Sequence, residues 1–153
     1  MFDLKIKFSI LGVIIFILPM LINLVYFKVA PQESSAVMPN KYRWIEWIEQ
    51  ATRMIYMLLI CLLVSKHSVS FKSPYLYLSL FFLILYYIVW IRYFMSSMQL
   101  SVLKGNFLFV PMPLVIFPVL YFIFAALWLN NLPAVITMIV FGVAHYFVSY
   151  MTL

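Results

Sequence analysis

The chain has 153 residues, of which 67% are hydrophobic, 20% are aromatic and only 9% are charged. A water-soluble domain of this size carries about a quarter charged residues, so the composition excludes a soluble globule and predicts that lipid surrounds most of the chain. The net charge of +6 comes from basic residues scattered singly between apolar runs. That pattern indicates membrane lipids with anionic headgroups as partners and no binding to nucleic acid.

The single cysteine, Cys61, excludes a disulfide within the chain and any site built from several cysteines. It lies in the apolar run MLLICLLV, where a cysteine behaves as a small buried hydrophobic residue. We therefore expect no redox or nucleophilic role for it. No metal site, no cofactor and no catalytic residue is predicted.

The first apolar segment, from Phe8 to Phe27, has 20 residues without a charge between Lys7 and Lys28. A helix of that length crosses roughly 30 Å of hydrocarbon, whereas a cleavable signal peptide has a shorter apolar core of about 7–15 residues. We predict a first membrane span that is not cleaved, with a kink at Pro19 near its middle.

Residues 29–43 contain prolines, serines and mixed charge, so we predict a loop before a second helix that starts near residue 44. The uncharged part of that helix, Met54 to Ser65, has only 12 residues and is too short to span alone. Its first two turns are therefore expected in the interface or within protein, with Trp44 and Trp47 anchored at the level of the headgroups.

The remaining spans follow from two long uncharged stretches. Ser73 to Ile91 gives 19 uncharged residues for a third span, and 49 residues without Asp, Glu, Lys or Arg follow Lys104. The second stretch suits two spans, divided by a turn at the polar and proline-containing sequence NNLP.

Three prolines, Pro111, Pro113 and Pro118, mark the start of the fourth span. Prolines remove backbone donors and clash with the preceding turn, so regular helix is expected to begin only near Val115. Irregular backbone at membrane depth persists where protein packs around it or where it lines a cavity.

The predicted fold class is all-α: one polytopic membrane helix bundle over residues 1–153, with a fourth helix broken by proline at its start. An odd number of spans places the termini on opposite faces of the membrane. Basic residues are almost equally divided between the two faces, and we predict a cytoplasmic N-terminus in the plasma membrane because two lysines precede the first span. The five spans are predicted near residues 5–28, 44–65, 74–97, 108–129 and 133–151.

The most informative polar residues lie in WIEWIEQATR at the start of the second helix. Their spacing places Glu46, Glu49 and Arg53 on one helical face, and Glu49 and Arg53 can pair at i, i+4. An arginine inside a span costs about 2.5–3.5 kcal/mol, so a partner is expected, and we predict a Glu49–Arg53 pair directed into the bundle. Two interpretations stay open: a locally neutralised start of an interfacial helix, or a substrate or proton site.

The third helix ends in LYYIVWIRYF, which contributes Tyr87, Arg92 and Tyr93 as candidates. An aromatic belt with an interfacial arginine is one interpretation. In the other, Arg92 points inward and meets Glu46 or Glu49, since the start of the second helix and the end of the third lie on the same membrane face.

His145, in FGVAHYFVSY, is the one ionisable residue of the last span apart from tyrosine. It could relay protons, or it could hydrogen-bond across helices to Ser149 or to a tyrosine. No acid, cysteine or second histidine lies at i±3 or i±4, so a local metal site is unsupported. Gly142 predicts a close approach of a neighbouring helix, and Asn23 in the first span predicts a hydrogen bond between helices.

Four segments together carry a family resemblance: EQATR, LYYIVWIRYF, PMPLVIFPVLYF and FGVAHYFVSY. With them the chain resembles a family of small, uncharacterised bacterial five-helix integral membrane proteins. The resemblance covers most of the chain from Glu46 onward, and it implies the topology but no activity. The candidate residues that it implies are Glu49, Arg53, Tyr87, Arg92, Tyr93, Pro111, Pro113, Pro118, Tyr121 and His145.

The leading functional prediction is a non-enzymatic membrane component with a buried Glu/Arg/His cluster: a small transport subunit, a ligand-binding protein, or an accessory to a complex. Its partners would be a second copy or another membrane subunit. The alternative is an intramembrane enzyme acting on lipid or peptide, for which Glu49 and His145 are the candidates. A purely structural role is the third.

Overall fold

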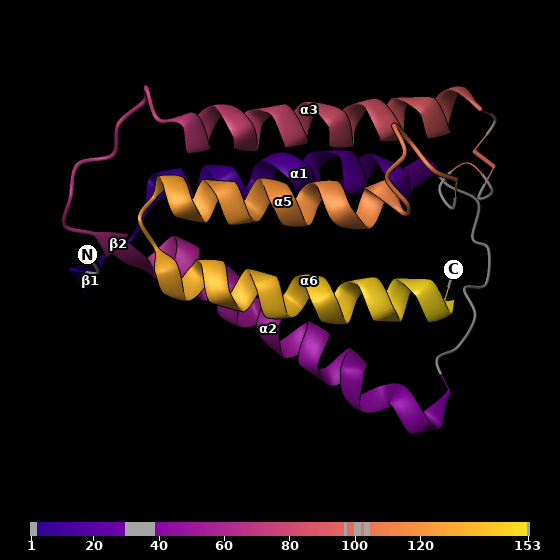
Figure 1. Ribbon diagram of the computed structural model, residues 1–153, viewed down its shortest axis with the longest axis horizontal. Helices are drawn as coiled ribbons and strands as arrows, with labels where there is room; N and C mark the ends of the chain where they lie inside the picture. Colours follow the sequence, from indigo (N-terminus) through magenta and orange to yellow (C-terminus); the bar gives the residue numbers. More distant parts are fainter. Residues whose placement is uncertain (1–2, 30–38, 97, 100–101, 103–104, 153) are drawn as a thin grey trace.

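The computed structural model describes residues 3–29, 39–96, 98–99, 102 and 105–152. Within these residues the chain is mostly helical, with two short strands (Figure 1). The strands are β1 (Leu4–Ile6) and β2 (Leu63–Ser65), and a short 3₁₀ turn, η1 (Asn40–Tyr42), precedes the second long helix. The long helices are α1 (Ile10–Val29), α2 (Arg43–Leu62), α3 (Pro74–Met95), α5 (Pro113–Trp128) and α6 (Leu132–Thr152).

The five long helices run back and forth along the long axis of the molecule (Figure 1). Helix α3 packs on α5, α5 packs on α6, and α6 packs on α2, while α1 contacts α2, α3 and α5. Strand β1 lies at one end of the bundle and the last turn of α6 lies at the other (Figure 1). Helix α3 lies on one side of α1 and α5, and α2 lies on the other side (Figure 1).

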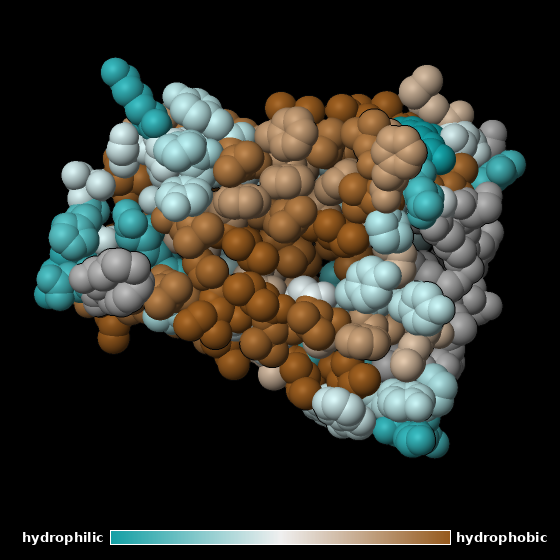
Figure 2. All heavy atoms as spheres, viewed as in Figure 1, coloured by the Kyte–Doolittle hydropathy of each residue, from teal (hydrophilic) through white to brown (hydrophobic). Residues whose placement is uncertain are grey.

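The outer surface is compatible with a membrane protein. Helices α1, α3 and α6 are long and apolar enough to cross a membrane by length and composition, and α5 is apolar but shorter. Figure 2 shows apolar side chains across the middle of the molecule and hydrophilic side chains gathered at its two ends. Large apolar side chains such as Ile17, Phe81 and Ile139 are exposed, as expected where lipid tails cover the helices.

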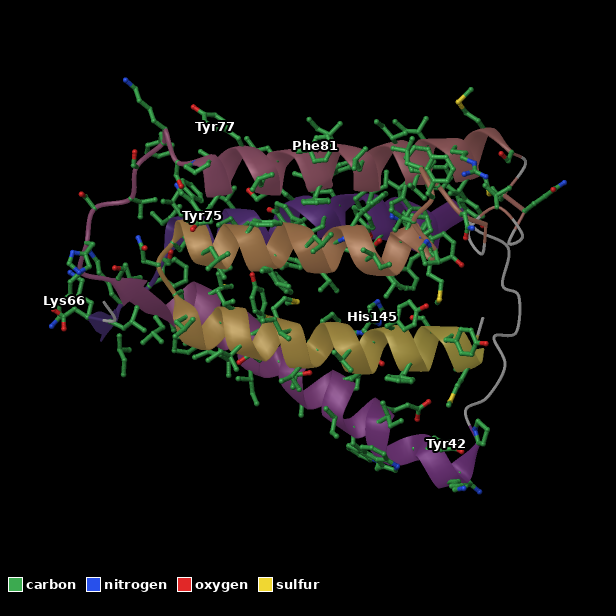
Figure 3. The ribbon with its side chains drawn as sticks, in the orientation of Figure 1. Tyr42, Lys66, Tyr75, Tyr77, Phe81 and His145 are labelled. Carbon is green, nitrogen blue, oxygen red and sulfur yellow. The ribbon has the colours of Figure 1, made fainter. Side chains whose placement is uncertain are left out.

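Aromatic side chains lie near both ends of the apolar region. Tyr75 and Tyr77 lie at the start of α3, whereas Tyr42 lies at the opposite end of the bundle (Figure 3). Trp44 and Trp47, which follow Tyr42, are largely exposed. The 22 residues of α3 extend over about 33 Å at the usual helical rise, close to the thickness of a bilayer core, and amphipathic aromatic rings favour its two interfaces.

The first two predicted spans were each too long at one end. The prediction began the first helix at residue 5 and ended the second at residue 65, but Leu4–Ile6 and Leu63–Ser65 pair as antiparallel strands. The amides of Lys7 and Ser9 donate to the carbonyls of Leu62 and Cys61, at 2.9 and 2.7 Å. These bonds satisfy carbonyl groups that the end of α2 leaves without helical partners, which periodicity within one segment does not reveal.

The chain before α5 is irregular, as predicted. Phe107 and Val110 form an isolated bridge, and Leu108, Phe109 and Met112 have positive φ angles. Regular helix begins at Pro113, two residues before the predicted start, because proline is well suited to the first turn of a helix. The predicted fourth span, from residue 108, therefore began five residues too early for the regular helix. The other predicted boundaries differ by at most two residues, and the predicted loop between the first two helices lies largely outside the described residues.

Two glycines mark close contacts between helices. A Cβ atom added at Gly142 of α6 would lie 2.6 Å from Cγ1 of Val119 on α5, which confirms the predicted close approach at this glycine. A Cβ atom added at Gly12 of α1 would lie 1.9 Å from the carbonyl oxygen of Ile60 on α2. Real Cβ atoms do not approach other atoms so closely, so both positions depend on the missing side chain.

Tyrosine hydroxyl groups connect the helices. Tyr56 donates to the carbonyl of Phe122 at 3.0 Å, and Tyr121 donates to the carbonyl of Ile15 at 2.8 Å. Tyr86 donates to Oδ1 of Asn23 at 2.7 Å, which confirms the hydrogen bond between helices predicted for this asparagine. Inside a helix bundle, such bonds satisfy buried polar groups that have no access to water.

Asn131 joins the end of α2 to the start of α6. Its side chain is fully buried, and Nδ2 donates to the carbonyls of Leu59 and Leu63, at 2.9 Å each. Its Oδ1 accepts the amide of Ala134 at 3.2 Å, as an N-cap residue does. The sequence predicted only a turn here.

Candidate functional site

The polar cluster of the molecule forms where α2 packs on α6. Helix α2 is amphipathic: its charged residues all lie within its first 11 positions, from Arg43 to Arg53, and apolar residues predominate after them. The face that carries Glu49 is buried against α6, and it meets His145 about two turns before the end of that helix. Figure 3 shows His145 well inside the two ends of the bundle.

A single carboxylate oxygen joins three side chains. Oε1 of Glu49 lies 2.6 Å from Nη2 of Arg53 and 3.0 Å from Nδ1 of His145. The Glu49 side chain is only 5% exposed, that of His145 is 25% exposed and that of Arg53 is 46% exposed. The predicted Glu49–Arg53 pair is therefore present, but only its acid faces the interior, because the long arginine side chain extends to the surface of the bundle.

Phe141 completes the cluster as an aromatic platform. Its ring stacks on that of His145, with centroids 5.0 Å apart and planes inclined by 20°. The guanidinium carbon of Arg53 lies 5.5 Å from the centroid of the same ring, within the range of a cation–π interaction. Phe141 is itself buried, so it fixes the positions of both polar groups. The sequence interpretation missed it, although its i, i+4 spacing from His145 was the available signal.

Each polar residue of the cluster keeps unused hydrogen-bonding capacity. Arg53 has five N–H donors, and its one side-chain hydrogen bond to a described residue is the one to Glu49. When Nδ1 of His145 donates to Glu49, the neutral ring presents Nε2 as an acceptor. The second oxygen of Glu49, Oε2, makes no bond within the described part of the chain. The cluster can therefore accept a further polar group.

The cluster lies well below the end of the bundle. Arg53 follows the first residue of α2 by ten positions, which corresponds to about 15 Å along the helix. His145 precedes the last residue of α6 by seven positions, or about 10 Å. A buried charged group without a partner is costly, so the position of this cluster between two packed helices makes it a candidate functional site.

The structure does not bring the other predicted site residues to this cluster. Tyr87, Arg92 and Tyr93 lie on α3, which packs on α5 and lies across the bundle from α2. Nη1 of Arg92 donates to the carbonyl of Asn106 at 3.4 Å, and its guanidinium lies over the ring of Phe107. The proposed contact of Arg92 with Glu46 or Glu49 is therefore not formed.

The remaining predicted residues have local roles. The Tyr87 hydroxyl donates to the carbonyl of Leu18, and Tyr93 is buried beside Trp90 in an aromatic group. Glu46 lies half-buried in the first turn of α2, where an acid interacts favourably with the helix dipole. His145 pairs with Glu49, not with Ser149 or a tyrosine as the sequence suggested. Its partner could not be predicted because 96 positions separate the two residues.

The coupling between Glu49 and Arg53 has a measurable consequence. Arg53→Leu leaves a buried carboxylate with one partner fewer, and we expect it to lower the free energy of unfolding by about 2 kcal/mol. The double variant Glu49→Gln/Arg53→Leu is expected to recover at least half of this loss, because no lone charge remains. Unfolding in detergent of the wild type, both single variants and the double variant measures the cycle.

Arg43→Leu is the matched control for that cycle. Arg43 lies exposed at the first position of the same helix, and its replacement is expected to change stability by less than about 0.5 kcal/mol. If the double variant instead loses the sum of the two single losses, Glu49 and Arg53 do not stabilise each other.

Comparison with known proteins gives no relative for this arrangement: no family model, curated protein or solved structure matches the chain. The resemblance to small bacterial five-helix membrane proteins stays a prediction.

Proposed function

We propose that the chain is a multi-pass membrane protein in which all five long helices cross the bilayer, and that its Glu49–Arg53–His145 cluster binds a polar ligand. In this role it serves as a small transport component or as an accessory subunit of a membrane complex. Three helices, α1, α3 and α6, qualify as spans by length and composition, and we propose that α2 and α5 cross the bilayer as well.

The packing of α2 and α5 supports their inclusion. Helix α5 has 16 residues, or about 24 Å, and the irregular chain before it at Phe107–Val110 adds to its reach. Helix α5 packs between α3 and α6, and half of its 16 residues are buried while none is exposed. Helix α2 has 20 residues, enough for about 30 Å, and the buried acid among its charged residues, Glu49, is paired with Arg53 and His145.

One observation carries the ligand-binding proposal: a half-exposed arginine at depth whose guanidinium is only partly satisfied. Arg53 bonds to a buried carboxylate through one nitrogen, while 46% of its side chain stays exposed. A purely structural pair is expected to bury both members or to extend its arginine to the interface. A ligand at the exposed edge of the guanidinium would satisfy its remaining donors.

The topology can be tested with reporters fused to the N-terminus and to the C-terminus, or inserted within residues 66–73 and 98–110. The proposal expects the N-terminus and the 98–110 segment on opposite faces of the membrane, and likewise the C-terminus and the 66–73 segment. The protein is expected in the plasma membrane, with its N-terminus in the cytoplasm. Both termini on the same face would overturn the crossing of all five helices.

The ligand site can be tested by thermal unfolding of the purified full chain in nanodiscs. The panel of additives is sulfate, choline, phosphatidylglycerol and phosphatidylcholine. At least one of them is expected to raise the midpoint of unfolding of the wild type and of Arg43→Gln, but not that of Glu49→Gln/Arg53→Leu. Equal shifts in all three proteins, or no shift in any, would overturn the site.

The contact between Glu49 and His145 favours a second candidate, an intramembrane enzyme. Their 3.0 Å separation is that of a catalytic pair in which a carboxylate and an imidazole exchange a proton. However, the same oxygen of Glu49 also accepts from Arg53, which makes it a weaker nucleophile and base. Ligand binding therefore has the stronger support, and turnover of lipid or peptide that Glu49→Gln abolishes would favour the enzyme.

A further inference from the structure

We propose that the cluster binds an anionic group together with one proton, and that His145 carries that proton. The inference rests on the proposed ligand site and adds to it the charge of the ligand and its coupling to pH. The anionic group is a carboxylate, sulfate or phosphate oxygen, held by the free edge of Arg53.

The charge balance of the cluster leads to this inference. Glu49 and Arg53 neutralise each other at 2.6 Å, so with a neutral His145 the cluster has no net charge and attracts an anion weakly. Protonation of His145 gives the cluster a net charge of +1 and changes Nε2 from an acceptor to a donor. The bond from Nδ1 to Glu49 stays intact, so the proton adds charge without breaking a contact.

The surroundings of His145 leave this charge uncompensated. Among the described residues, the charged groups that face it are Glu49 and Arg53 of α2. The neighbouring helices offer titratable hydroxyls that are already engaged: Tyr56 of α2 donates to Phe122, and Tyr121 of α5 donates to Ile15. Helix α5 has no acid or base in its sequence, and α6 has none besides His145 and its tyrosines. The counterion of the added proton therefore comes from the ligand.

The chemistry of Arg53 identifies the ligand as an oxyanion. A guanidinium presents parallel N–H donors that match the paired oxygens of a carboxylate or phosphate. The Phe141 ring covers one face of the guanidinium, so its edge is the part that remains for a ligand. The same chemistry occurs in a small soluble anion and in an anionic lipid headgroup, and the two sources need separate tests.

Coupling in one direction requires coupling in the other. If protonation of His145 tightens the binding of the anion, then the bound anion must favour protonation by the same factor. Histidine is the side chain that changes its charge between about pH 5 and 8. The affinity for the anion is therefore expected to rise as the pH falls through this range, and binding is expected to take up a proton.

The experiment uses the full chain in phosphatidylcholine nanodiscs, with sulfate as the soluble probe and phosphatidylglycerol as the lipid probe. Neither probe changes its charge over the range studied. The affinity of the preferred probe is expected to be about tenfold higher near pH 5.5 than near pH 8. Calorimetry of the wild type in buffers of different ionisation enthalpy is expected to show net proton uptake on binding.

Three variants assign the effect to residues. His145→Gln keeps a donor for Glu49 but cannot titrate, and it is expected to bind with the same affinity at both pH values. Glu49→Gln gives the cluster a permanent positive charge and is expected to bind near pH 8 as tightly as the wild type does near pH 5.5. Arg53→Gln is expected to lose binding at both pH values, whereas the control Arg43→Gln keeps the wild-type behaviour.

The possible outcomes separate the two proposals. Binding that is lost in Arg53→Gln but does not depend on pH would overturn the proton coupling and leave the ligand site standing. Binding that still depends on pH in His145→Gln would also overturn the proton coupling. No binding of either probe at either pH would overturn the anionic ligand. Stabilisation by choline and not by the anions would also overturn the anionic ligand, but it would support the ligand site. Proton uptake by the wild type tests the coupling even if a variant fails to fold.

Discussion

Gly12→Ala is expected to prevent α1 and α2 from packing and to lower the free energy of unfolding by about 3 kcal/mol or more. The added Cβ would lie 1.9 Å from the carbonyl oxygen of Ile60 and 2.7 Å from its carbonyl carbon. Both atoms belong to the backbone of a helix, so no change of rotamer can relieve the contact. The measurement is the midpoint of thermal unfolding in detergent, together with the fraction of monodisperse protein.

Gly142→Ala is the matched comparison, because its new Cβ would meet a side chain and not a backbone. The nearest atom is Cγ1 of Val119, at 2.6 Å, and the second substitution Val119→Ala removes it. The double variant is therefore expected to recover most of the stability that Gly142→Ala loses. Recovery of Gly12→Ala by shortening Ile60 to alanine would contradict the explanation, since that change leaves the carbonyl in place.

Asn131→Leu is expected to lower the free energy of unfolding by about 3–5 kcal/mol. The two side chains have the same branched arrangement of four heavy atoms, so the change replaces hydrogen-bonding atoms by methyl groups at the same positions. It leaves the carbonyls of Leu59 and Leu63 without the Nδ2 donor and the amide of Ala134 without the Oδ1 acceptor. Each unsatisfied buried group costs about 1–3 kcal/mol, and the site is closed to water because Asn131 is fully buried.

Asn130→Gly provides the control for that variant. Asn130 is exposed and has a φ angle of 53°, a conformation that glycine adopts easily. Its replacement is expected to leave stability within about 0.5 kcal/mol of the wild type. If unfolding shows equal losses for the two neighbours, the turn depends on its general polarity and not on the bonds of Asn131.

The helices could be predicted from the sequence because their signals are local. Uncharged runs between basic residues located α1 and α3, and NNLP located the turn between α5 and α6 to within two residues. The prolines before α5 predicted irregular backbone for a reason that acts within a few residues, the loss of amide donors. The pair of Glu49 and Arg53 was equally accessible, since one helical turn joins them.

The features that the sequence interpretation missed are long-range. Pairing of Leu4–Ile6 with Leu63–Ser65 depends on two chain segments that meet only after α1 and α2 have packed. The choice of α6 and not α3 as the neighbour of Glu49 depends on the order in which helices pack across the bundle. Several arrangements of five apolar helices satisfy the same hydrophobic pattern, so Arg92 and His145 were equally plausible partners until the packing was known.

During synthesis of the chain, several hydrogen bonds of α2 can form only after much later residues have been made. The carbonyls of Leu59 and Leu63 can bond to Asn131 only after about 70 more residues have been made. Glu49 can bond to His145 only after 96 more residues. A ribosome adds residues at about 5–20 per second, so α2 lacks these later partners for several seconds, although Glu49 keeps Arg53 and the carbonyl of Leu59 keeps the amide of Leu63. Helix α2 is the second long helix to be made and among the last to be fully satisfied. A nascent chain that stops before Asn131 therefore has an α2 that differs from the finished one, because it lacks His145 beside Glu49 and Asn131 beside the carbonyl of Leu63.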